Sequence, residues 1–412
     1  MLFSIAWKNV WRNKLRSLIV ILSISLGLLG GLFYLAFANG MVQHQINATI
    51  KTQISNIQFH NPKYMLNNEV KYTIDSPASI IKKIEKIKGI KAITSRIKST
   101  ALASSAITGA GITINGINPV KEKNVTDLYK KIIKGTYLIP NKKYQIFIGQ
   151  KLADKLKVKV KSKIVITVLD ISGNIISGAF RIVGIFKTES TNFDLYNVFV
   201  LNNDLRRLID FPTKQTTEIA VLLNKNNQTD YVANKIKKIF SKAISEKKLD
   251  VETWMEIQPA LKLINEMFIQ YSMIFLIIIL VALSFGIINT MLMAIMERVR
   301  ELGMLMAIGM SKARIFLMIM LETIFLSITG GAAGLFISWI AITITHKTGI
   351  DLSVVSEGLN ALGYSSFVYP ILGITYYILI GSLVIVTAIT ASILPARKAL
   401  KLNPAEAVRQ NV

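Results

Sequence analysis

Four long apolar stretches constrain this chain more than any other feature of its sequence. Windows without Asp, Glu, Lys or Arg cover residues 17–45, 267–296, 324–345 and 369–394. About 20 consecutive apolar residues are enough for an α-helix to cross the hydrocarbon core of a bilayer. The sequence therefore predicts an α-helical membrane protein with four transmembrane helices. The third span extends back to Ile315 if one acidic residue, Glu322, is tolerated inside it.

The first apolar run could be a cleavable signal peptide, because a basic start precedes it and Ala36-Phe37-Ala38 resembles a cleavage site. The run has about 20 residues, however, whereas the apolar core of a signal peptide has about 7–15. We therefore expect a retained anchor. In the lead-in to this anchor, Trp7 and Trp11 lie opposite Lys8 and Arg12 on a helical pattern, which predicts an amphipathic helix at the membrane surface.

Basic residues flank the spans asymmetrically. Four precede the first span, four separate the second from the third, and four follow the last: Lys8, Arg12, Lys14, Arg16; Arg298, Arg300, Lys312, Arg314; Arg397, Lys398, Lys401, Arg409. Lys and Arg in short loops accumulate on the cytoplasmic side of a membrane. We therefore expect a multi-pass protein of the inner (cytoplasmic) membrane, with both termini and the loop 297–314 in the cytoplasm and residues 46–266 outside it.

The long segment between the first two spans is strongly basic. The chain has a formal charge of +25, and residues 41–267 hold 36 Lys and Arg against 18 Asp and Glu. This excess suits either a solvated, Lys-rich surface or attraction to anionic lipid headgroups. No helical recognition motif and no interleaved pattern of aromatic and basic residues accompanies the charge, so we expect no nucleic-acid partner.

Residue types that carry chemistry are scarce. The chain has no cysteine, which excludes disulfides and thiol chemistry, and His44, His60 and His346 are far apart in the sequence. We therefore expect no metal site. No GxxxxGK[ST] loop occurs, so we expect no ATP site of the Walker type. With no catalytic residues in a recognisable spacing, we also expect no enzyme activity of its own and no cofactor.

Residues 46–266 predict a mixed α/β domain inserted between helices 1 and 2. Alternating residues at 54–60 indicate a strand, residues 105–117 indicate a hairpin with glycine turns, and Ser172-Gly173-Asn174 indicates a turn between two strands. Helices are predicted from Ser76-Pro77 to Gly89, with Pro at the first helical position, and over residues 230–249. The expected division of the chain is 1–45, 46–266 and 267–412.

The loop 297–314 predicts a short amphipathic helix over residues 297–308. Its apolar face would consist of Val299, Leu302, Leu305, Met306 and Ile308. Gly309 can end such a helix in the left-handed conformation. Twelve residues span roughly 18 Å, so the helix would form a short rod along the cytoplasmic interface. The pattern alone leaves two interpretations open, which are anchoring to lipid and contact with a cytoplasmic partner.

This block resembles the coupling helix of the ABC permeases that include the macrolide exporter MacB, the cell-division protein FtsX and the lipoprotein-releasing permeases LolC and LolE. The family pattern is E-R-x-x-E-[IL]-G followed by A-x-G-[MA], and it matches Glu297, Arg298, Glu301, Leu302, Gly303, Ala307, Gly309 and Met310. Other matches, in order along the chain, are WKNVWRNKLRSLI, IGQKLADKLKVKVKSKI, FRIVGIF, IFLMIMLETIFLSITGGAAGLFISW and LPARKALKLNPAEAVR. The family's Leu-Gly-Val and Gly-Asp are replaced by Leu156-Lys157-Val158 and Lys161-Ser162.

The resemblance implies a permease subunit that performs no chemistry. Its partner would be a separate cytoplasmic ABC ATPase dimer that binds ATP and Mg, and a second permease, identical or paralogous, would complete the complex. ATP-driven closure of the ATPase would push on the coupling helix and move the outer domains. The residues expected to contact the ATPase are Glu297, Arg298, Arg300, Glu301, Leu302, Gly303, Ala307, Gly309 and Met310. Contact of the N-terminal lead-in with the ATPase is an alternative to membrane anchoring.

Two features inside the third span have more than one interpretation. A carboxylate near the bilayer centre costs about 2.5–3.5 kcal/mol, so Glu322 must face protein, water or a basic partner. It could relay movement of the coupling helix, or it could tie the span to a neighbour through a local hydrogen bond. Gly330, Gly331 and Gly334 are small residues that permit close helix packing.

Apolar residues at the outer ends of the first two spans are candidates for substrate access. They are Met41, Met267, Phe268 and Met273. Met side chains are flexible and adapt to varied apolar surfaces, which would suit a lipid-linked substrate entering between two permeases. Packing against membrane lipid is the alternative.

Within the family, the expected substrate is a lipoprotein released from the inner membrane toward an outer-membrane carrier. Ala38-Asn39-Gly40-Met41 is similar to the Asn-Gly-Phe that ends the first span in LolC and LolE, and ETWMEIQPAL is similar to the segment that leads to their second span. One alternative is the permease of a tripartite export system for peptides or small toxic molecules. Another is an FtsX-like regulator of cell-wall hydrolases, although FtsX outer domains are smaller.

Overall fold

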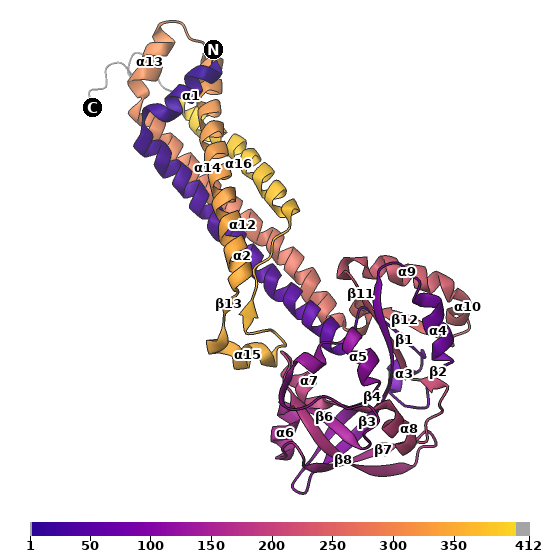
Figure 1. Cartoon of the computed structure of the whole chain (residues 1–412). Helices are drawn as coiled ribbons and strands as arrows, with labels where there is room; N and C mark the ends of the chain where they lie inside the picture. The colour runs from indigo at the N-terminus through magenta and orange to yellow at the C-terminus, as the bar shows by residue number, and fades with distance from the viewer. Residues whose placement is uncertain (1, 401–412) are drawn as a thin grey trace. The chain divides into compact units, whose positions relative to one another are not determined.

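The computed structural model describes residues 2–400 of the 412-residue chain (Figure 1). These residues form two compact units, each of which is described by itself. The helical unit comprises residues 2–42, 265–351 and 367–400, and the α/β unit comprises residues 43–264 and 352–366. The expected cytoplasmic tail, with its LNPAEAVR motif, begins at the end of α16 and lies almost entirely outside the described residues.

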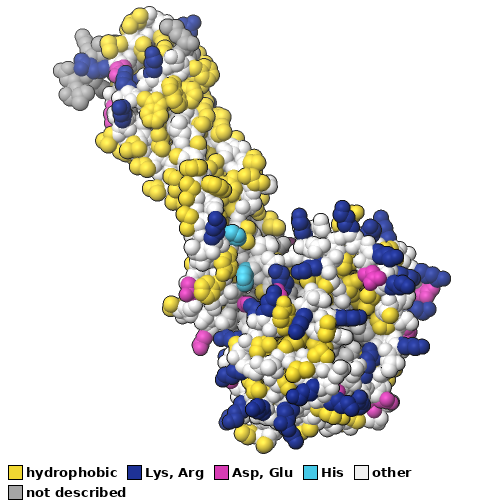
Figure 2. Space-filling view, in the orientation of Figure 1, with side chains coloured by type: hydrophobic (Ala, Val, Ile, Leu, Met, Phe, Trp, Pro, Cys, Tyr) yellow, Lys and Arg dark blue, Asp and Glu magenta, His cyan; other side chains and the backbone are white. Residues whose placement is uncertain are grey.

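Four long helices confirm the four predicted spans. They are α2 (Lys14–Thr49), α12 (Pro259–Glu297), α14 (Lys312–Thr348) and α16 (Ile374–Leu400). Each is long and apolar enough to cross a membrane. A shorter helix, α1 (Leu2–Arg12), precedes α2. Figure 2 shows hydrophobic side chains over much of the visible surface of these helices, as expected for helices that face lipid.

Glycines on α14 let two neighbouring helices approach it closely. A Cβ added at Gly334 would lie 2.9 Å from the Cα of Ser25 on α2, and one at Gly330 would lie 3.2 Å from the α2 backbone. The Ser25 hydroxyl also donates a hydrogen bond to the Gly330 carbonyl, at 2.9 Å. Gly331 instead faces α16, where a Cβ would lie 3.4 Å from Val384. The three glycines thus position α14 against both α2 and α16.

The α/β unit is built on one ten-stranded sheet. Nine strands follow the order β12-β1-β11-β3-β4-β9-β6-β8-β5, and β7 pairs with β3 and β8. Their bounds are β1 (Ile57–His60), β3 (Ile90–Ser104), β4 (Gly109–Ile117), β5 (Ile132–Gly135), β6 (Gln145–Gly149), β7 (Lys163–Leu169), β8 (Ile175–Phe186), β9 (Asn197–Leu201), β11 (Glu218–Leu223) and β12 (Asp250–Thr253). A separate pair joins β2 (Ile74–Asp75) to β10 (Gln215–Thr216). The mixed α/β insertion predicted between helices 1 and 2 is confirmed.

Helices and helical turns cover this sheet. They are η1 (Ile50–Ile54), α3 (Tyr64–Asn67), α4 (Pro77–Ile84), α5 (Pro119–Val125), η2 (Leu128–Lys130), α6 (Gln150–Leu156), α7 (Thr191–Tyr196), α8 (Asn202–Leu208), η3 (Asn226–Gln228), α9 (Thr229–Ile239), α10 (Ser241–Ser245) and α11 (Trp254–Ile257). Figure 2 shows Lys and Arg side chains distributed over the visible face of the unit, with no single large patch.

The long strand β3 joins two parts of the sheet. Its first part, residues 90–96, pairs with β11, and its second part, from Ile97 onward, pairs with β4. Each part has its own apolar core. One core lies around Phe59, Val221 and Val251 with α4 and α9, and the other around Ile114, Ile148 and Ile182 with α6. Residue 96 therefore stands where the two parts meet.

Some local predictions differ from the structure. The predicted hairpin forms between β3 and β4, but its turn is Ser105–Thr108, closed by a hydrogen bond from Ser105 N–H to Thr108 O of 2.9 Å, and not a glycine turn. Helix α4 begins at Pro77 as predicted but ends at Ile84 rather than Gly89. The turn at Ser172-Gly173-Asn174 forms as predicted, with Gly173 at φ +88°.

The segment between α14 and α16 groups with the α/β unit by its contacts. Residues 352–366, with η4 (Ser353–Val355) and α15 (Ser356–Ala361), belong to the α/β unit rather than to the expected third region, 267–412. The physical reason is that they contact that unit: the Gln45 side chain donates a 3.0 Å hydrogen bond to the Leu362 carbonyl. Two short strands, β13 (Ile350–Asp351) and β14 (Phe367–Val368), pair at the base of the segment.

Candidate functional site

The short helix after α12 is the first candidate site. It is α13 (Val299–Ala307), three residues shorter than the predicted 297–308. Glu297 is instead the last residue of α12. Arg298 leaves the helical conformation, with φ −109° and ψ 15°, and its N–H bonds to the Ile295 carbonyl in a tighter turn. The sequence could not reveal this break, because the helical periodicity continues across it.

The C-terminal end of α13 has the cap that Gly309 predicts from the sequence. Gly309 has φ +97°, a conformation that disfavours any residue with a Cβ. The Met310 N–H bonds to the Leu305 carbonyl at 3.0 Å, and the Gly309 N–H bonds to the Met306 carbonyl at 3.1 Å. This pair of bonds is the Schellman arrangement. It stops α13 sharply, so that α14 can begin three residues later at Lys312.

Helix α13 carries apolar side chains on two faces. Val299, Leu302 and Gly303 are buried, and Leu302 belongs to the apolar core of the helical unit. Ile308, which the pattern placed on the same apolar face, is 84% exposed. This prediction was wrong because the helix ends at Ala307 and the chain turns away at Gly309. Met304, Ala307 and Ile308 therefore form an exposed apolar surface, called here the α13 tip.

A chain of ion pairs connects α13 to two other helices. The Arg298 guanidinium lies 3.0 and 3.1 Å from the two carboxylate oxygens of Glu322 on α14. It also donates to Glu301 on α13, at 2.9 Å. Glu301 in turn accepts from Arg12 on α1, at 2.6 Å. Helix α1 and the consecutive helices α13 and α14 are thus linked through four charged side chains.

The two ends of this chain differ in burial. The side chains of Arg298 and Glu322 are 13% and 5% exposed, whereas those of Arg12 and Glu301 are 54% and 42% exposed. The hydrogen bond from Arg12 and the nearby Arg298 lower the pKa of Glu301 below its ordinary value, so it stays ionised. Removing one partner of the buried Arg298–Glu322 pair would leave an uncompensated charge and therefore cost more than breaking the exposed outer pair.

The amphipathic lead-in packs on the third long helix. The rings of Trp7 and Phe325 meet edge to face, with centroids 5.4 Å apart, and Phe3 contacts the same ring at 6.2 Å. Trp7 and Trp11 are each 45% exposed. Helix α1 is thereby held against α14 near the level of Glu322. The link from Arg12 to Glu301 was not predicted, since no spacing rule connects residues 289 positions apart.

The substrate-access candidates do not gather in one cavity. Met267 and Met273 are 44% and 47% exposed on α12, and Met41 and Phe268 are half-buried. Helices α2 and α12 do form an apolar groove, of about 270 Å³, but other residues line it, among them Gly27, Ile279 and Gly286. The access role of the four residues stays a prediction.

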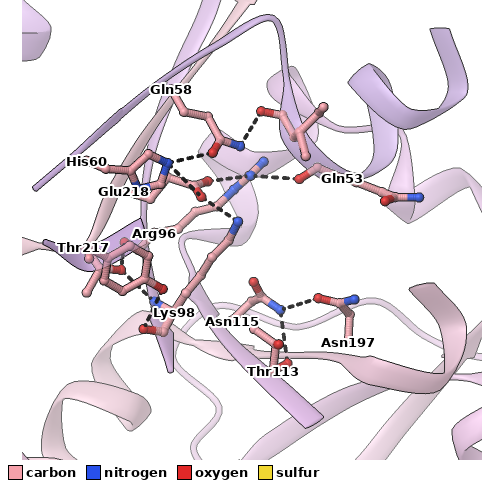
Figure 3. Close-up of polar contacts among 12 residues, drawn as sticks. Gln53, Gln58, His60, Arg96, Lys98, Thr113, Asn115, Asn197, Thr217 and Glu218 are labelled. Atoms are coloured by element: carbon pink, nitrogen blue, oxygen red, sulfur yellow. Dashed lines mark hydrogen bonds and ion pairs between the residues drawn. The ribbon is translucent and has the colours of Figure 1, made fainter. Parts of the chain in front are cut away.

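A buried cluster of charged residues in the α/β unit is a second candidate site, which sequence reasoning missed. Figure 3 shows the Arg96 side chain, which comes from β3, reaching Glu218 of β11 and the Gln53 carbonyl of η1. Its guanidinium pairs with Glu122 at 2.6 Å and with Glu218 at 2.8 Å, and both partners are at most 1% exposed. Lys98 also pairs with Glu218, at 2.5 Å. The cluster therefore connects α5 and β11 at the point where the two parts of β3 meet.

His60 borders the same cluster. Its ring is buried, stacks on Tyr64 with centroids 5.5 Å apart, and contacts the Gln58 side chain at 2.7 Å through Nε2 (Figure 3). Burial lowers the pKa of His60 to about 4. For Glu218, burial alone would raise the pKa, but Lys98 and Arg96 outweigh it and lower the pKa to about 2. At neutral pH the cluster thus holds a neutral imidazole beside an ionised carboxylate.

Nothing in the described residues points to metal chemistry. No group of three or more His, Cys, Asp and Glu side chains in residues 2–400 is placed to hold a metal ion.

Two protein-family models match the chain. The MacB-like periplasmic core domain matches residues 17–239, and the FtsX-like permease C-terminal domain matches residues 273–404. The first covers the first span and most of the α/β unit, and the second covers the remaining spans with α13. Together they confirm the family resemblance that the block after α12 indicated.

Curated relatives include several permeases. An uncharacterized ABC transporter permease of Methanocaldococcus jannaschii is 25% identical over 99% of this chain and 97% of its own length. The lipoprotein-releasing system transmembrane protein LolC of Neisseria meningitidis is 24% identical over 97% of this chain and 95% of its own. The macrolide export ATP-binding/permease protein MacB of Escherichia coli is 24% identical over 54% of this chain, which is 32% of the longer MacB.

Solved structures of outer domains also match part of the chain. The extracellular domain of the transporter YknZ from Gram-positive bacteria covers 48% of this chain and 98% of its own, at 16% identity and a TM-score of 0.34. The periplasmic region of MacB from Actinobacillus actinomycetemcomitans covers 53% and 97%, at 11% identity and a TM-score of 0.34.

Proposed function

Because the chain belongs to the ABC transporter permeases that combine a MacB-like periplasmic core with an FtsX-like C-terminal domain, we propose that it transmits force from a separate cytoplasmic ATPase dimer to its own outer domain. In this proposal the ATPase binds ATP and Mg, and a second permease, identical or paralogous, completes the complex. The protein lies in the inner membrane with both termini and α13 in the cytoplasm. The α/β unit lies on the opposite side.

The observation that carries the proposal is the position of α13 in its network. One face of α13 is buried in the core of the helical unit, and the α13 tip is exposed. Arg298 connects the N-terminal end of α13 to Glu322 inside α14. A push on the α13 tip would therefore move a rod whose other side is fixed to the spans. Interfaces of this kind have an exposed apolar anchor surrounded by charged residues, and Arg300 and Lys312 flank the tip in sequence.

The proposed substrate is a lipoprotein released from the membrane toward an outer-membrane carrier. The support is that two relatives named as lipoprotein-releasing proteins match over 95% and 81% of their own length, whereas the relatives named as macrolide and pyoverdine exporters match over 32% and 58% of theirs. Export of peptides or small toxic molecules, and regulation of cell-wall hydrolases, are the rival outcomes of the experiment below.

The experiment compares two single variants of the full chain purified from membranes in mild detergent. Ile308→Asp places a charge on the α13 tip, where the side chain is 84% exposed, so folding should be unaffected. Val354→Asp makes the same change at a residue that is 99% exposed in the α/β unit. We expect Ile308→Asp to reduce the copurified ATPase by at least about tenfold, as loss of an interface anchor does, and Val354→Asp to leave it unchanged.

Mass spectrometry of the intact complex then identifies every chain and every lipid-modified protein. An acylated protein bound to the unaltered complex supports lipoprotein release, whereas a bound hydrolase or an adaptor of an export system would replace that proposal. Retention of the ATPase by Ile308→Asp at the level of the unaltered protein would contradict the coupling role of α13.

A further inference from the structure

A cavity of about 690 Å³ opens on the α/β unit beside the start of β3. Four consecutive strand residues, Ile90 to Ile93, line it. Successive side chains of a strand point to opposite faces of the sheet. A cavity that touches four residues in a row must therefore reach the edge of the strand and not only one face.

This edge of β3 has no strand beside it. Helix α5, which follows β4, contacts β3 where Glu122 pairs with Arg96, and Lys121 and Val125 of α5 line the cavity. Residues 90–96 pair with β11 on one side. On the other side, pairing with β4 starts only at Ile97 and pairing with β7 at Ala101, and no strand within residues 2–400 pairs with the second edge of residues 90–96. In an antiparallel ladder every second residue turns its N–H and C=O away from its partner. Such an edge is a template for an additional strand.

The rim of the cavity is basic. Five lysines line it, against two acidic residues: Lys51, Lys91, Lys121, Lys123 and Lys130 against Glu85 and Asp127. Asp127 and Lys130 pair with each other at 2.7 Å, which leaves four lysines against one acid. The Nζ atoms of Lys123 and Lys130 also lie 5.7 and 5.5 Å from the centroid of the Tyr129 ring, which holds both cations at the rim. The cavity thus favours a negatively charged ligand.

The floor of the cavity is apolar. Val125 and Leu222 are buried there, and Ala92 and Ile93 are half-buried. An extended chain beside β3 would place alternate side chains over this floor and the others toward the lysines, because its own side chains also alternate. The ligand that fits is therefore an extended peptide in which apolar residues alternate with Asp or Glu.

We propose that an extended, acidic segment of a partner protein binds here by adding a strand to the edge of β3. The unpaired edge supplies main-chain hydrogen bonds, and the lysine rim supplies specificity for acidic side chains. A phosphate headgroup could meet the lysines but would leave both the strand edge and the apolar floor unused. The proposal concerns the α/β unit alone and holds whichever substrate the permease moves.

The test uses the full chain in detergent and a fluorescent peptide of alternating Glu and Val, followed by fluorescence anisotropy. The peptide should bind, and the triple variant Lys91→Glu, Lys123→Glu, Lys130→Glu should bind it at least tenfold more weakly. The matched control is Lys151→Glu, Lys155→Glu, Lys159→Glu, which makes the same charge change at exposed lysines outside the cavity. This control should weaken binding less than twofold. Equal weakening by both triple variants, or no binding of the peptide to the unaltered chain, overturns the proposal.

A second peptide separates strand addition from simple charge attraction. It has the same sequence and charge but carries N-methyl groups on alternate amides, so it cannot form a ladder along one edge. We expect at least a tenfold loss of affinity. Equal binding of both peptides overturns the proposal. The proposal is also overturned if phosphatidylglycerol vesicles displace the peptide from the unaltered chain but not from the triple variant Lys91→Glu, Lys123→Glu, Lys130→Glu. The site would then bind lipid headgroups.

Discussion

Burial keeps the His60 imidazole of the Arg96 cluster neutral at neutral pH. His60 has no polar partner for its Nδ1 atom, and its Nε2 lies 4.0 Å from the Glu218 carboxylate. A charged imidazole would gain this carboxylate as a neighbour but would lose its hydration, and Lys98 and Arg96 already neutralise Glu218. The loss outweighs the gain, which is why the pKa of His60 falls to about 4.

The depressed pKa of His60 predicts that this residue destabilises the α/β unit in mild acid. The folded state binds fewer protons than the unfolded state between the ordinary pKa of 6.5 and the folded value of about 4. His60 therefore contributes a loss of stability as the pH drops through this window, by about 2 kcal/mol between pH 7 and pH 5. Glu252 and Asp194, whose pKa values burial raises to about 7 and about 6, act in the opposite direction over the same range. The depressed pKa of Glu218 acts in the same direction as that of His60 below about pH 4.5. Hydrogen exchange of β3 and β11, corrected for intrinsic rates, measures the loss.

His60→Phe should remove the His60 contribution, because it removes the titrating ring and can keep the stacking on Tyr64. The variant should therefore keep more of its protection on going from pH 7 to pH 5 than the unaltered protein does. His346→Phe is the control, since His346 lies in the helical unit and should not affect exchange in β3. If the change in exchange protection between pH 7 and pH 5 is the same in the unaltered protein and in His60→Phe, His60 is not a group that titrates in this range.

At the scale of elements, the joint between α12, α13 and α14 depends on one buried pair. The Arg298 side chain is 13% exposed and pairs with Glu322 and with the more exposed Glu301. Glu322→Ala removes the buried one of these two partners. Removing one partner of a buried pair costs on the order of 3 kcal/mol, whereas replacing both by apolar residues of similar size costs much less. We expect Glu322→Ala to lower the unfolding temperature in detergent clearly and the double variant Arg298→Leu, Glu322→Leu to recover most of the loss.

Arg12→Ala provides the matched control within the same chain of ion pairs. Its partner Glu301 is 42% exposed, so the change should cost less than about 1 kcal/mol. If the double variant Arg298→Leu, Glu322→Leu is no more stable than Glu322→Ala, the Arg298 and Glu322 side chains are not coupled.

The elements that local chemistry specifies were predictable from the sequence. Long apolar windows gave the four spans, Ser76-Pro77 gave the start of α4, and Gly309 gave the end of α13. Each depends on residues that are close in sequence. The break at Arg298 was not predictable, because the helical periodicity continues across it and Glu322, which Arg298 contacts, lies 24 positions away.

The candidate sites were less predictable than the fold, since they join distant residues. Arg12 meets Glu301, 289 positions away, and Arg96 meets Glu218, 122 positions away. Arg96 and Glu218 stand on strands in a basic segment, where charged residues usually face solvent, so no local pattern marked them as buried. The register of β3 against β11, which places the two residues opposite each other, is the missing information.

At the scale of the whole molecule, charge is distributed unevenly along the chain. Residues 41–267 carry 36 Lys and Arg against 18 Asp and Glu, which is most of the net +25. Such a long domain can cross a membrane regardless of its charge, because the positive-inside rule acts on short loops. The topology therefore depends on the short basic segments near α1, α13 and the end of α16, and these predict the α/β unit on the side opposite α13.

The chain has no cysteine, so a single introduced cysteine reports the side of the membrane on which it lies. Ile308 and Val354 are 84% and 99% exposed. In the sequence, the long helix α14 lies between them. Its 37 residues span roughly 55 Å, more than the hydrocarbon thickness of about 30 Å. In spheroplasts, a membrane-impermeant maleimide should label Val354→Cys directly and Ile308→Cys only after permeabilisation. Labelling of both without permeabilisation would mean that α14 does not cross the membrane, and α13 could then not receive force from a cytoplasmic ATPase.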